Sequence, residues 1–462
     1  MASGDGQASS VQALRGAAAK LSKRDYTFLD DVPLNGFHCK MAGLTFGAHF
    51  TEGYALGTIG YALPSLSAQM ELDAFWHGLI GSSALAGIFI GSLLFGWLSD
   101  RVGRQKIFLL SFLIITTTAF AQFFVDSPLQ LCIMRVLLGF GMGGDFAVGH
   151  AILAEFSPRK HRGMLLGSFS VIWTIGYVAA NLIGMQYGHV SPDAWRWLLA
   201  SAGLPALIVL ILRMGTPESP RWLLGQGRLG EAQAIVRRYF GAKVRLDTSK
   251  MHEHGEHAHS GGYARLFKRD LIRRTLFNCI FFVCLVIPYF AIYTFLPGIL
   301  KMLHLEDGHV ADLLLNGFLI LGAVIGIWLT IVLPRRVFLI TSFFATGVAL
   351  LALGLLPESS AAALIAVFAL FTLVMSAVSN LVGVFPPECF PTEVRACGVG
   401  LAVACSRLGS AVGTFLLPIG VAHFGFQPAI IVLGVILFAG MAVSMVWAPE
   451  TRNLRLNEAA RA

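Results

Sequence analysis

Four ionisable side chains stand in long apolar stretches of this sequence: Glu52, Arg135, Asp145 and Arg407. A carboxylate can take up and release a proton, whereas a guanidinium stays charged and can hold a carboxylate through two parallel hydrogen bonds. A charge inside an apolar environment is expensive, so each side chain should face a polar cavity and have a partner. Together the four residues predict proton exchange and anion binding inside an apolar body.

Two of these charges belong to the glycine-rich run RVLLGFGMGGDFAVGH, residues 135–150, and its Gly139, Gly141 and Gly144 match the dinucleotide-binding pattern G-x-G-x-x-G. That pattern works between a strand and a helix, but here one long apolar stretch surrounds it and no P-loop lysine follows. We expect the glycines to allow close helix packing instead. No cofactor, bound metal or catalytic residue is predicted, and the chain is not expected to be an enzyme.

The composition indicates where such charges lie. Of the 462 residues, 56% are hydrophobic and 13% are charged, and the mean hydropathy is +0.71. A surface this apolar requires lipid as its solvent, and a helix of about 20 apolar residues spans a bilayer. We therefore expect an all-α integral membrane protein with twelve transmembrane helices, approximately at 40–64, 78–98, 107–125, 129–154, 164–186, 195–213, 273–300, 311–333, 337–356, 361–385, 397–420 and 427–447.

The basic residues are distributed by membrane side. Of the 34 Lys and Arg residues, 30 fall on the side of the N-terminus, and the exceptions are Arg196, Lys301, Arg135 and Arg407. Cytoplasmic loops of membrane proteins carry this excess. We expect both termini in the cytoplasm and the protein in the plasma membrane, as in bacterial inner-membrane proteins. The net charge of +8 then reflects orientation, and no nucleic-acid partner is predicted.

The chain also repeats itself. The pattern E-x-x-P-x-x-x-R-x-x-x-x-G begins at Glu155 and begins again at Glu388. The tripeptide PES at 217–219 is likewise followed by PET at 449–451, and the separation of the two copies is nearly the same for both motifs. Two motif pairs that share one offset indicate a duplicated chain, which is the plan of secondary transporters built from two parallel repeats.

The duplication and one long polar interruption divide the chain into five predicted segments. They are a cytoplasmic N-terminal segment (1–39), a first six-helix bundle (40–213), a cytoplasmic linker (214–269), a second six-helix bundle (270–448) and a cytoplasmic tail (449–462). We call the two bundles the first and the second half. In the linker, GRLGEAQAIVRRYFG predicts an amphipathic helix on the membrane face. The run HEHGEHAH, with His252, His254, His257 and His259, is a polar linker or a divalent-metal site, and the linker reading is simpler.

The segment GWLSDRVGRQK, residues 96–106, resembles the loop signature of the major facilitator superfamily, although Gln105 stands where a basic residue is usual. PESPRWL and PETRN resemble the sugar-porter and organic-ion branches of that superfamily. The resemblance covers almost the whole chain and implies twelve helices in two pseudo-symmetric bundles. It also implies transport by alternating access.

In that superfamily, a cluster of charges at the cytoplasmic ends of the helices holds the outward-facing state. The resemblance assigns this gate to Gly96, Asp100, Arg101, Gly103, Arg104, Glu155, Arg162, Glu388 and Arg395. Glu155 is the expected partner of Arg101 or Arg104. The matching loop of the second half, LPRRVF, keeps two arginines and lacks the aspartate and the glycine, so the latch should be stronger in the first half. Plain anchoring of the basic residues on the cytoplasmic side is the alternative.

The first predicted helix resembles that of the aromatic-acid/proton symporters. In FTEGYALGTIGYALP, Glu52 holds the first acidic position of the family motif and Ala55 replaces the second acid. Proton-linked sugar porters pair an acid of helix 1 with an arginine of helix 4, which implies a Glu52–Arg135 pair here. His49 lies three residues before Glu52, on the same helical face. Asp145, in GMGGDFAVG, resembles an acidic position of metabolite/proton symporters and is a second proton-carrier candidate.

The duplication does not require these charges. At the offset of the repeat, the equivalent positions hold Leu285 for Glu52, Phe368 for Arg135, Val378 for Asp145 and Thr174 for Arg407. A costly charge whose repeat partner is uncharged is a functional candidate. Permanent structural ion pairs are the alternative for each of these charges, including a pair between Arg407 and either Asp145 or Glu52.

Arg407 comes from the second half, and a transported organic anion is its expected partner. Aromatic side chains that could line the cavity are Trp173, Tyr177, Tyr289 and Tyr293, with Asn380 as a polar contact and Asn181 and Asn316 as less specific ones. The seventh helix lacks the glutamine pair and asparagine of sugar porters, which disfavours a sugar.

The sequence as a whole predicts a monomeric, proton-coupled symporter of a small organic anion such as an aromatic or heterocyclic carboxylate. The alternatives are a sugar or polyol porter, a proton-driven exporter of organic cations or drugs, and a membrane sensor that does not transport.

Overall fold

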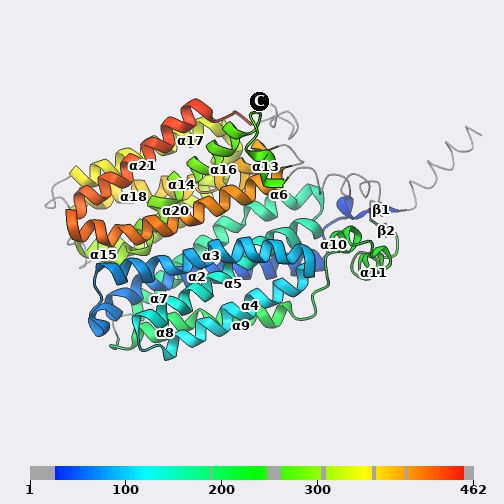
Figure 1. The fold of residues 1–462 in the computed structure, drawn as a ribbon, viewed down its shortest axis with the longest axis horizontal. Coiled ribbons are helices and arrows are strands. Elements are labelled where there is room, and N and C mark those ends of the chain that lie inside the picture. Colours follow the sequence, from blue (N-terminus) through cyan, green and yellow to red (C-terminus); the bar gives the residue numbers. More distant parts are fainter. Residues whose placement is uncertain are drawn as a thin grey trace, which may run out of the picture.

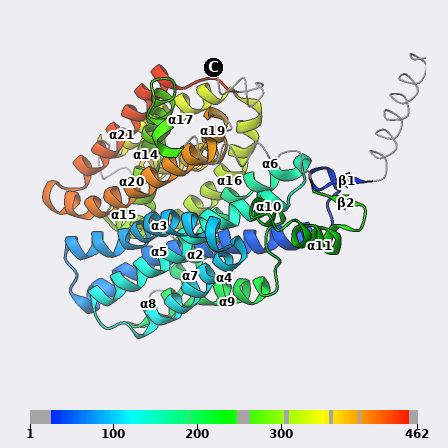
Figure 2. The ribbon, with the colours of Figure 1, turned by 45° about the vertical axis from the view of Figure 1, so that its right-hand side comes forward.

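The computed structural model describes residues 26–187, 190–246, 262–302, 309–355, 361–390 and 394–451. The histidine run at 252–259 lies outside the described residues. Helices dominate, and they form two bundles that lie side by side (Figures 1 and 2). Figure 1 shows the first half in blue to green and the second half in green to red.

Each predicted transmembrane stretch corresponds to one helix or to two consecutive ones. In the first half these are α2 (Gly36–Met70), α3 (Ala74–Val102), α4 (Arg104–Ala121), α5 (Pro128–Phe156), α6 (Arg159–Gly167) with α7 (Phe169–Tyr187), and α8 (Ala194–Ser201) with α9 (Gly203–Arg213). In the second half they are α14 (Ile272–Thr294) with α15 (Leu296–Met302), α16 (His309–Val332), α17 (Arg335–Leu355), α18 (Ala361–Val378) with α19 (Leu381–Cys389), α20 (Arg395–Phe424) and α21 (Phe426–Trp447).

Among the described residues, eleven helical segments are long and apolar enough to cross a membrane. The twelfth expected span is α2, which is 35 residues long and carries more polar side chains than its neighbours. The expected twelve-helix fold is confirmed. In each half the helices pack in the same manner: α2 lies against α7 and α3 against α5, while α14 lies against α20 and α16 against α18.

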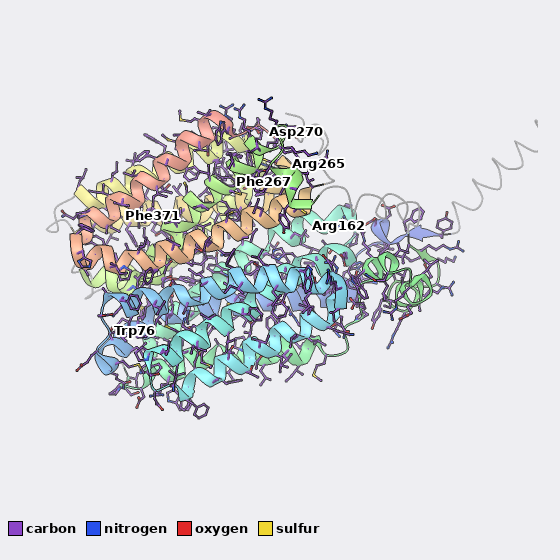
Figure 3. All side chains as sticks on the ribbon, viewed as in Figure 1. Trp76, Arg162, Arg265, Phe267, Asp270 and Phe371 are labelled. Carbon is purple, nitrogen blue, oxygen red and sulfur yellow. The ribbon has the colours of Figure 1, made fainter. Side chains whose placement is uncertain are left out.

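The two halves meet chiefly along two helix pairs, α3 with α20 and α7 with α16, and further contacts join α2 to α14 and α15 and α6 to α19. One end of the molecule carries a small additional unit made of β1 (Thr27–Phe28), η1 (Leu29–Asp31), α10 (Pro220–Gly225), α11 (Leu229–Phe240) and β2 (Val244–Arg245) (Figure 1). We call this the linker end. Trp76 lies at the opposite end, whereas Arg162, Arg265 and Asp270 lie toward the linker end (Figure 3).

The amphipathic helix expected in the linker is α11. Its buried residues Ala232 and Val236 pack against Leu29, Val32 and Leu223 of the N-terminal segment and α10. The parallel pairing of β1 with β2 fixes that segment to the linker. The apolar face of α11 therefore meets protein, which corrects the expectation that it rests on the membrane.

The glycines of the run at 135–150 bring α5 close to two neighbouring helices. A Cβ atom at Gly139 or Gly143 would collide with the backbone of α3, and one at Gly141 would collide with Ser111 of α4. This close packing is what small residues permit between membrane helices. It fixes the depth and direction of the two charged side chains on α5, Arg135 and Asp145.

Candidate functional site

A completely buried ion pair lies between α5 and α9. Nη1 of Arg213 donates to Oδ1 of Asp145 over 2.5 Å and to the carbonyl oxygen of Phe108 over 2.8 Å. Both charged side chains are 0% exposed. The guanidinium also lies over the rings of Phe108 and Phe112, at 3.4 and 4.0 Å from their centroids. Asp145 thus has a dedicated arginine, which sequence reasoning did not single out.

Glu52 of α2 joins this pair. Its side chain is fully buried, lies close enough to Asp145 to share a hydrogen bond with it, and interacts electrostatically with Asp145, Arg213 and Arg407. Two neighbouring carboxylates repel each other when both are ionised. A proton on Glu52 would relieve that repulsion, so the geometry suits a residue that changes its protonation state.

Arg407 contributes to the cluster from the second half. Its guanidinium lies between aromatic rings of both halves, 4.9 Å from the centroid of Phe146 and 5.5 Å from that of Phe290. It interacts electrostatically with Glu52 and Tyr289. The Glu52–Arg407 interaction therefore connects the two halves, and Asp145 pairs with Arg213 rather than with Arg407.

Arg135 does not pair with Glu52, which differs from the expectation. The residue is 1% exposed, and none of its three guanidinium nitrogens has a hydrogen-bond partner. Arg135 shares a pocket with Ile59, which lies seven residues beyond Glu52 on α2. At 1.5 Å per residue this is a rise of about 10 Å, so the two charges lie at different levels in the bundle.

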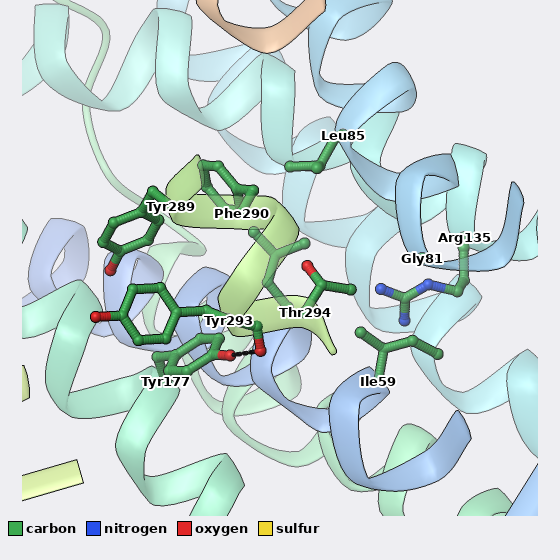
Figure 4. A pocket seen from close by; sticks show the side chains of 10 residues that line it. Ile59, Gly81, Leu85, Arg135, Tyr177, Tyr289, Phe290, Tyr293 and Thr294 are labelled. Carbon is green, nitrogen blue, oxygen red and sulfur yellow. Dashed lines mark hydrogen bonds between the residues drawn. The ribbon is translucent and has the colours of Figure 1, made fainter. Parts of the chain in front are cut away.

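The pocket beside Arg135 lies between the halves and has a cavity volume of about 10 Å³ in this conformation, which is roughly the room of one water molecule (Figure 4). Its walls are close together in this conformation. The first half contributes Leu56, Ile59, Gly81, Leu85, Arg135 and Tyr177, and α14 of the second half contributes Tyr289, Phe290, Tyr293 and Thr294.

The four aromatic residues expected around a cavity come together. The ring of Trp173 is stacked on that of Tyr177 at 5.6 Å and lies 6.2 Å from that of Tyr289, and the rings of Tyr289 and Tyr293 are 4.7 Å apart. The hydroxyl of Tyr177 donates to the carbonyl oxygen of Tyr293 over 2.6 Å, across the two halves.

The asparagines separate into two environments. Asn380 donates to the carbonyl oxygens of Ala323 and Ala377 and so joins α16 to α18, away from the cluster. Asn181 donates to the side-chain oxygen of Asn316 over 2.8 Å, which is a contact between the halves. Asn380 thus stabilises helix packing within the second half. Asn181 and Asn316, which the sequence marked as less specific candidates, lie at the interface between the halves.

His49 lies beside a second histidine that sequence reasoning passed over. The ring of His49 is stacked on that of Phe169 at 4.0 Å, and its centroid is 4.9 Å from that of His150. Nδ1 of His49 donates to the carbonyl oxygen of Thr45, and Nδ1 of His150 donates to that of Phe146. His150 is the last residue of the glycine-rich run, and its position little more than one helical turn beyond Asp145 was an available signal.

At the linker end, the expected gate residues of the first half are only partly connected. Nε of Arg104 lies 3.1 Å from Oε1 of Glu155, so Glu155 pairs with Arg104. Asp100 is 70% exposed and lies 3.4 Å from Arg104. The guanidinium of Arg101 lies over the ring of Trp97 instead of an acid. Gly103 has a φ of +115° and separates α3 from α4, as a turn there requires.

Gly96 does not enforce a close helix approach in this structure. A Cβ atom at Gly96 would meet Ala147 at 3.8 Å, an ordinary van der Waals distance. The acid of the PES motif has the larger structural role. The Glu218 carboxylate accepts from the backbone N–H groups of Arg104 and Gln105 over 3.0 and 3.1 Å and so caps α4.

The second half repeats this arrangement. Arg335 lies 3.5 Å from Glu388, as Arg104 lies near Glu155. Glu450 of the PET motif accepts from the backbone N–H groups of Arg335 and Arg336 over 3.0 and 3.1 Å, which caps α17. The side chain of Arg395 lies outside the part of the chain whose side chains are described.

Arg162 belongs to a different contact. It donates to Asp30 of the N-terminal segment over 2.6 Å, and Arg221 donates to the same carboxylate oxygen over 2.5 Å. Asp30 therefore ties the segment before α2 to α6 and to α10. Burial raises the pKa of Asp30, but Arg221 and Arg162 together lower it by more than burial raises it. The pKa of Asp30 therefore lies below the ordinary value of 3.8.

Known proteins resemble this chain over nearly its whole length. A family model described as "Sugar (and other) transporter" matches residues 41–462. The inner membrane metabolite transport protein YgcS of Escherichia coli (strain K12) is 53% identical over 428 residues, covering 93% of this chain and 95% of that protein. The putative metabolite transport protein YaaU of the same organism is 36% identical over 431 residues, covering 92% and 95%.

The fold has solved counterparts. The xylose transporter XylE from E. coli, in a partially occluded inward open conformation, matches with a TM-score of 0.76 at 19% identity and covers 91% of this chain and 100% of that chain. Two packed bundles, the buried charges between them and these matches together identify the protein. The chain belongs to the sugar (and other) transporter family of the major facilitator superfamily and is an integral membrane transporter of small molecules.

Proposed function

We propose that this transporter carries a small organic anion together with a proton. The observation that supports this function is the electrostatic interaction between the buried Glu52 of the first half and Arg407 of the second. A carboxylic acid and a guanidinium that meet between two moving bundles can couple the protonation of one to the ligand binding of the other.

The coupling follows from charge balance. When Glu52 is ionised it compensates Arg407, and a substrate carboxylate must compete with it. When Glu52 takes up a proton, Arg407 is left without an anion, and a substrate carboxylate can bind it through charge-assisted hydrogen bonds. Asp145 stays compensated by Arg213 in both steps. Proton and anion therefore bind together, which is symport.

The contacts between the halves suggest the direction of access in this form. Tyr61 donates to Asp312, Asn181 donates to Asn316, and Tyr177 donates to the backbone of Tyr293. These contacts lie on the α2, α7, α14 and α16 segments away from the linker end. The described ion pairs at the linker end, such as Arg104–Glu155 and Arg335–Glu388, join elements of one half. The cavity is proposed to open toward the linker end.

The excess of Lys and Arg on that side assigns the linker end to the cytoplasm. Both termini and the tail at 449–462 are then cytoplasmic, and this form is the inward-facing one. Each half contributes charged or aromatic residues to a single cavity, so one chain is sufficient for transport and a monomer is proposed.

A sugar or polyol is the second candidate substrate, because XylE transports xylose and the family is described by sugars. Two features favour an anion. The guanidinium of Arg135 lines the pocket and that of Arg407 lies beside Phe290, a residue of the pocket wall. The other pocket side chains are aliphatic or aromatic apart from Thr294, and none of them is an amide. A ligand stabilises the folded state that binds it, so thermal unfolding with carboxylates and with sugars separates the two candidates.

The decisive variant is Glu52→Gln, which has the shape of the protonated acid and cannot titrate. Reconstituted in proteoliposomes, it should still exchange labelled substrate across the membrane and should no longer accumulate substrate when a pH gradient is imposed. Glu231→Gln, which changes an exposed acid of α11, is the control and should accumulate substrate normally. Accumulation by Glu52→Gln that equals wild type would refute Glu52 as the coupled proton site.

A further inference from the structure

Arg135 is a buried cation that has no acidic partner among the residues that the structure describes. It is 1% exposed, its Nε, Nη1 and Nη2 atoms have no hydrogen-bond partner, and its electrostatic neighbour is the Cys132 thiol. A buried charge without a partner is costly, and a cation at mid-depth in a membrane protein normally faces a partner or a cavity. Figure 4 shows the guanidinium directed toward the pocket, near Thr294 and Ile59.

The described acids of the interior are already engaged elsewhere. Among the described residues, the fully buried acids are Glu52 and Asp145. Asp145 is bound by Arg213, and Glu52 interacts with Asp145, Arg213 and Arg407. Of the interior arginines in the described part of the chain, Arg135 is thus the one for which no described acid compensates the charge.

Arg135 and Arg407 flank the same pair of aromatic residues. Tyr289 and Phe290 of α14 line the pocket that contains Arg135. The Arg407 guanidinium lies 5.5 Å from the centroid of Phe290 and interacts with Tyr289. An apolar wall therefore separates two cationic groups, one from each half.

We infer that Arg135 is a second anion-binding subsite and that the substrate carries two anionic groups joined by an apolar core. This inference rests on the proposed function, in which Arg407 binds the first anionic group. The charge balance supports it: once Glu52 is protonated, Arg135 and Arg407 both lack an acid, and a dianion neutralises both. Two guanidiniums, each able to hold a carboxylate or phosphate through paired hydrogen bonds, recognise such a ligand at its two ends.

A substitution of a pocket residue can fill this subsite from within the protein. Ile59 of α2 lines the pocket together with Arg135 and is buried. An aspartate at this position would place a carboxylate beside Arg135, so Ile59→Asp should compete with a ligand for Arg135 while leaving the arginine in place.

The test compares two ligands of the same shape, terephthalate and 4-carbamoylbenzoate, in which a neutral amide replaces one carboxylate. Binding to the purified full chain is measured by titration calorimetry and by the shift of the unfolding temperature. Wild type should bind the diacid about tenfold or more tightly than the monoacid, the scale of one charge-assisted interaction. Arg135→Gln and Ile59→Asp should each abolish this preference and leave monoacid binding within about twofold of wild type.

Arg196→Gln is the matched control, because Arg196 pairs with the exposed Asp126 outside the pocket, and it should keep the preference for the diacid. Equal affinity of wild type for both ligands, or equal loss of both in Arg135→Gln, would overturn the second subsite and leave the proposed anion function intact. If neither carboxylate binds to wild type while sugars stabilise it, the proposed function itself fails, and the subsite fails with it.

Discussion

The two halves of this transporter have the same pattern of charged contacts at the linker end and different charged residues in the interior. At the linker end each half has an arginine beside an acid, Arg104 with Glu155 and Arg335 with Glu388, and a second acid that caps the same helix. In the interior the first half contributes Glu52, Arg135, Asp145 and Arg213, whereas the second half contributes Arg407.

The difference separates two kinds of constraint. Contacts that hold the helix ends of a bundle are needed wherever the bundle is used, so duplication keeps them in both copies. A charge in the apolar interior is costly and is retained where it has a task. The asymmetry therefore indicates that binding and coupling chemistry developed mainly in the first half, with the second half supplying one guanidinium and an aromatic wall.

The largest effect should come from breaking the buried pair of the first half. Arg213→Gln leaves Asp145 as an uncompensated buried charge, and we expect it to lower the free energy of unfolding by about 3–5 kcal/mol. The double variant Arg213→Gln/Asp145→Asn should recover part of this loss because neither charge remains. Thermal and denaturant unfolding in detergent measure both effects.

The control for this prediction is Arg228→Gln, which removes an exposed pair with Glu231 and should leave the free energy of unfolding almost unchanged. If Arg213→Gln is as stable as this control, the Asp145–Arg213 pair is not the structural anchor of the first half. The contrast between the interiors of the two halves would then lose its energetic basis.

The next effect tests the similarity of the two halves at the linker end. Glu155 and Glu388 have similar side-chain exposures, 16% and 20%, and each forms an ion pair with an arginine, Arg104 or Arg335. We expect Glu155→Gln and Glu388→Gln to lower the free energy of unfolding by similar amounts, about 1–2 kcal/mol each. Their effects on the rate of substrate exchange in proteoliposomes should also agree within about threefold.

This outcome differs from the stronger first-half latch that the sequence predicts from Asp100 and Gly103. Asp100 is largely exposed, and an exposed ion pair contributes little. A Glu155→Gln variant that exchanges substrate far more slowly than Glu388→Gln would restore the predicted asymmetry.

The sequence alone was sufficient to predict the membrane helices and to identify most of the charged and aromatic residues that lie in the interior. Apolar length predicts membrane helices well, because unsatisfied backbone groups leave few alternatives in lipid. The spacing of Trp173 and Tyr177, and of Tyr289 and Tyr293, also placed each pair on one helical face. These are local properties that a single helix determines.

The ion-pair partners of the charged residues were predicted less well, because a pairing depends on how deep the residues of different helices lie relative to one another. The sequence suggested Glu52 for Arg135, but the packing of α5 places Arg135 at the level of Ile59. Arg213 ends an apolar stretch and resembled an ordinary anchoring residue, although α9 ends inside the protein against Asp145. Glu218 was visible only as part of a family motif, and its capping contact requires the tertiary structure.

The smallest predicted effect concerns a contact of the first half alone. Asp30 holds Arg162 and Arg221, whereas the equivalent position of the second half, at the offset of the repeat, is Tyr263, which has no carboxylate. Removing this contact by Asp30→Asn should lower the free energy of unfolding by about 1 kcal/mol at neutral pH, since the groups are only partly buried. Asp31→Asn, a change at the exposed neighbouring residue, is the control and should have little effect.

The pH dependence identifies the cause of that loss. The two arginines hold the folded-state pKa of Asp30 below 3.8, so the ionised carboxylate stabilises the folded state fully at pH values above 3.8. As the pH falls through the lowered folded-state pKa, the carboxylate is protonated and this stabilisation is lost. The difference in unfolding free energy between wild type and Asp30→Asn should therefore be constant at neutral pH and vanish in strong acid. A difference that persists unchanged in acid would mean that Asp30 acts through packing rather than charge, and the first half would then hold its N-terminal segment by the β1–β2 pairing and the cluster around Leu29 instead.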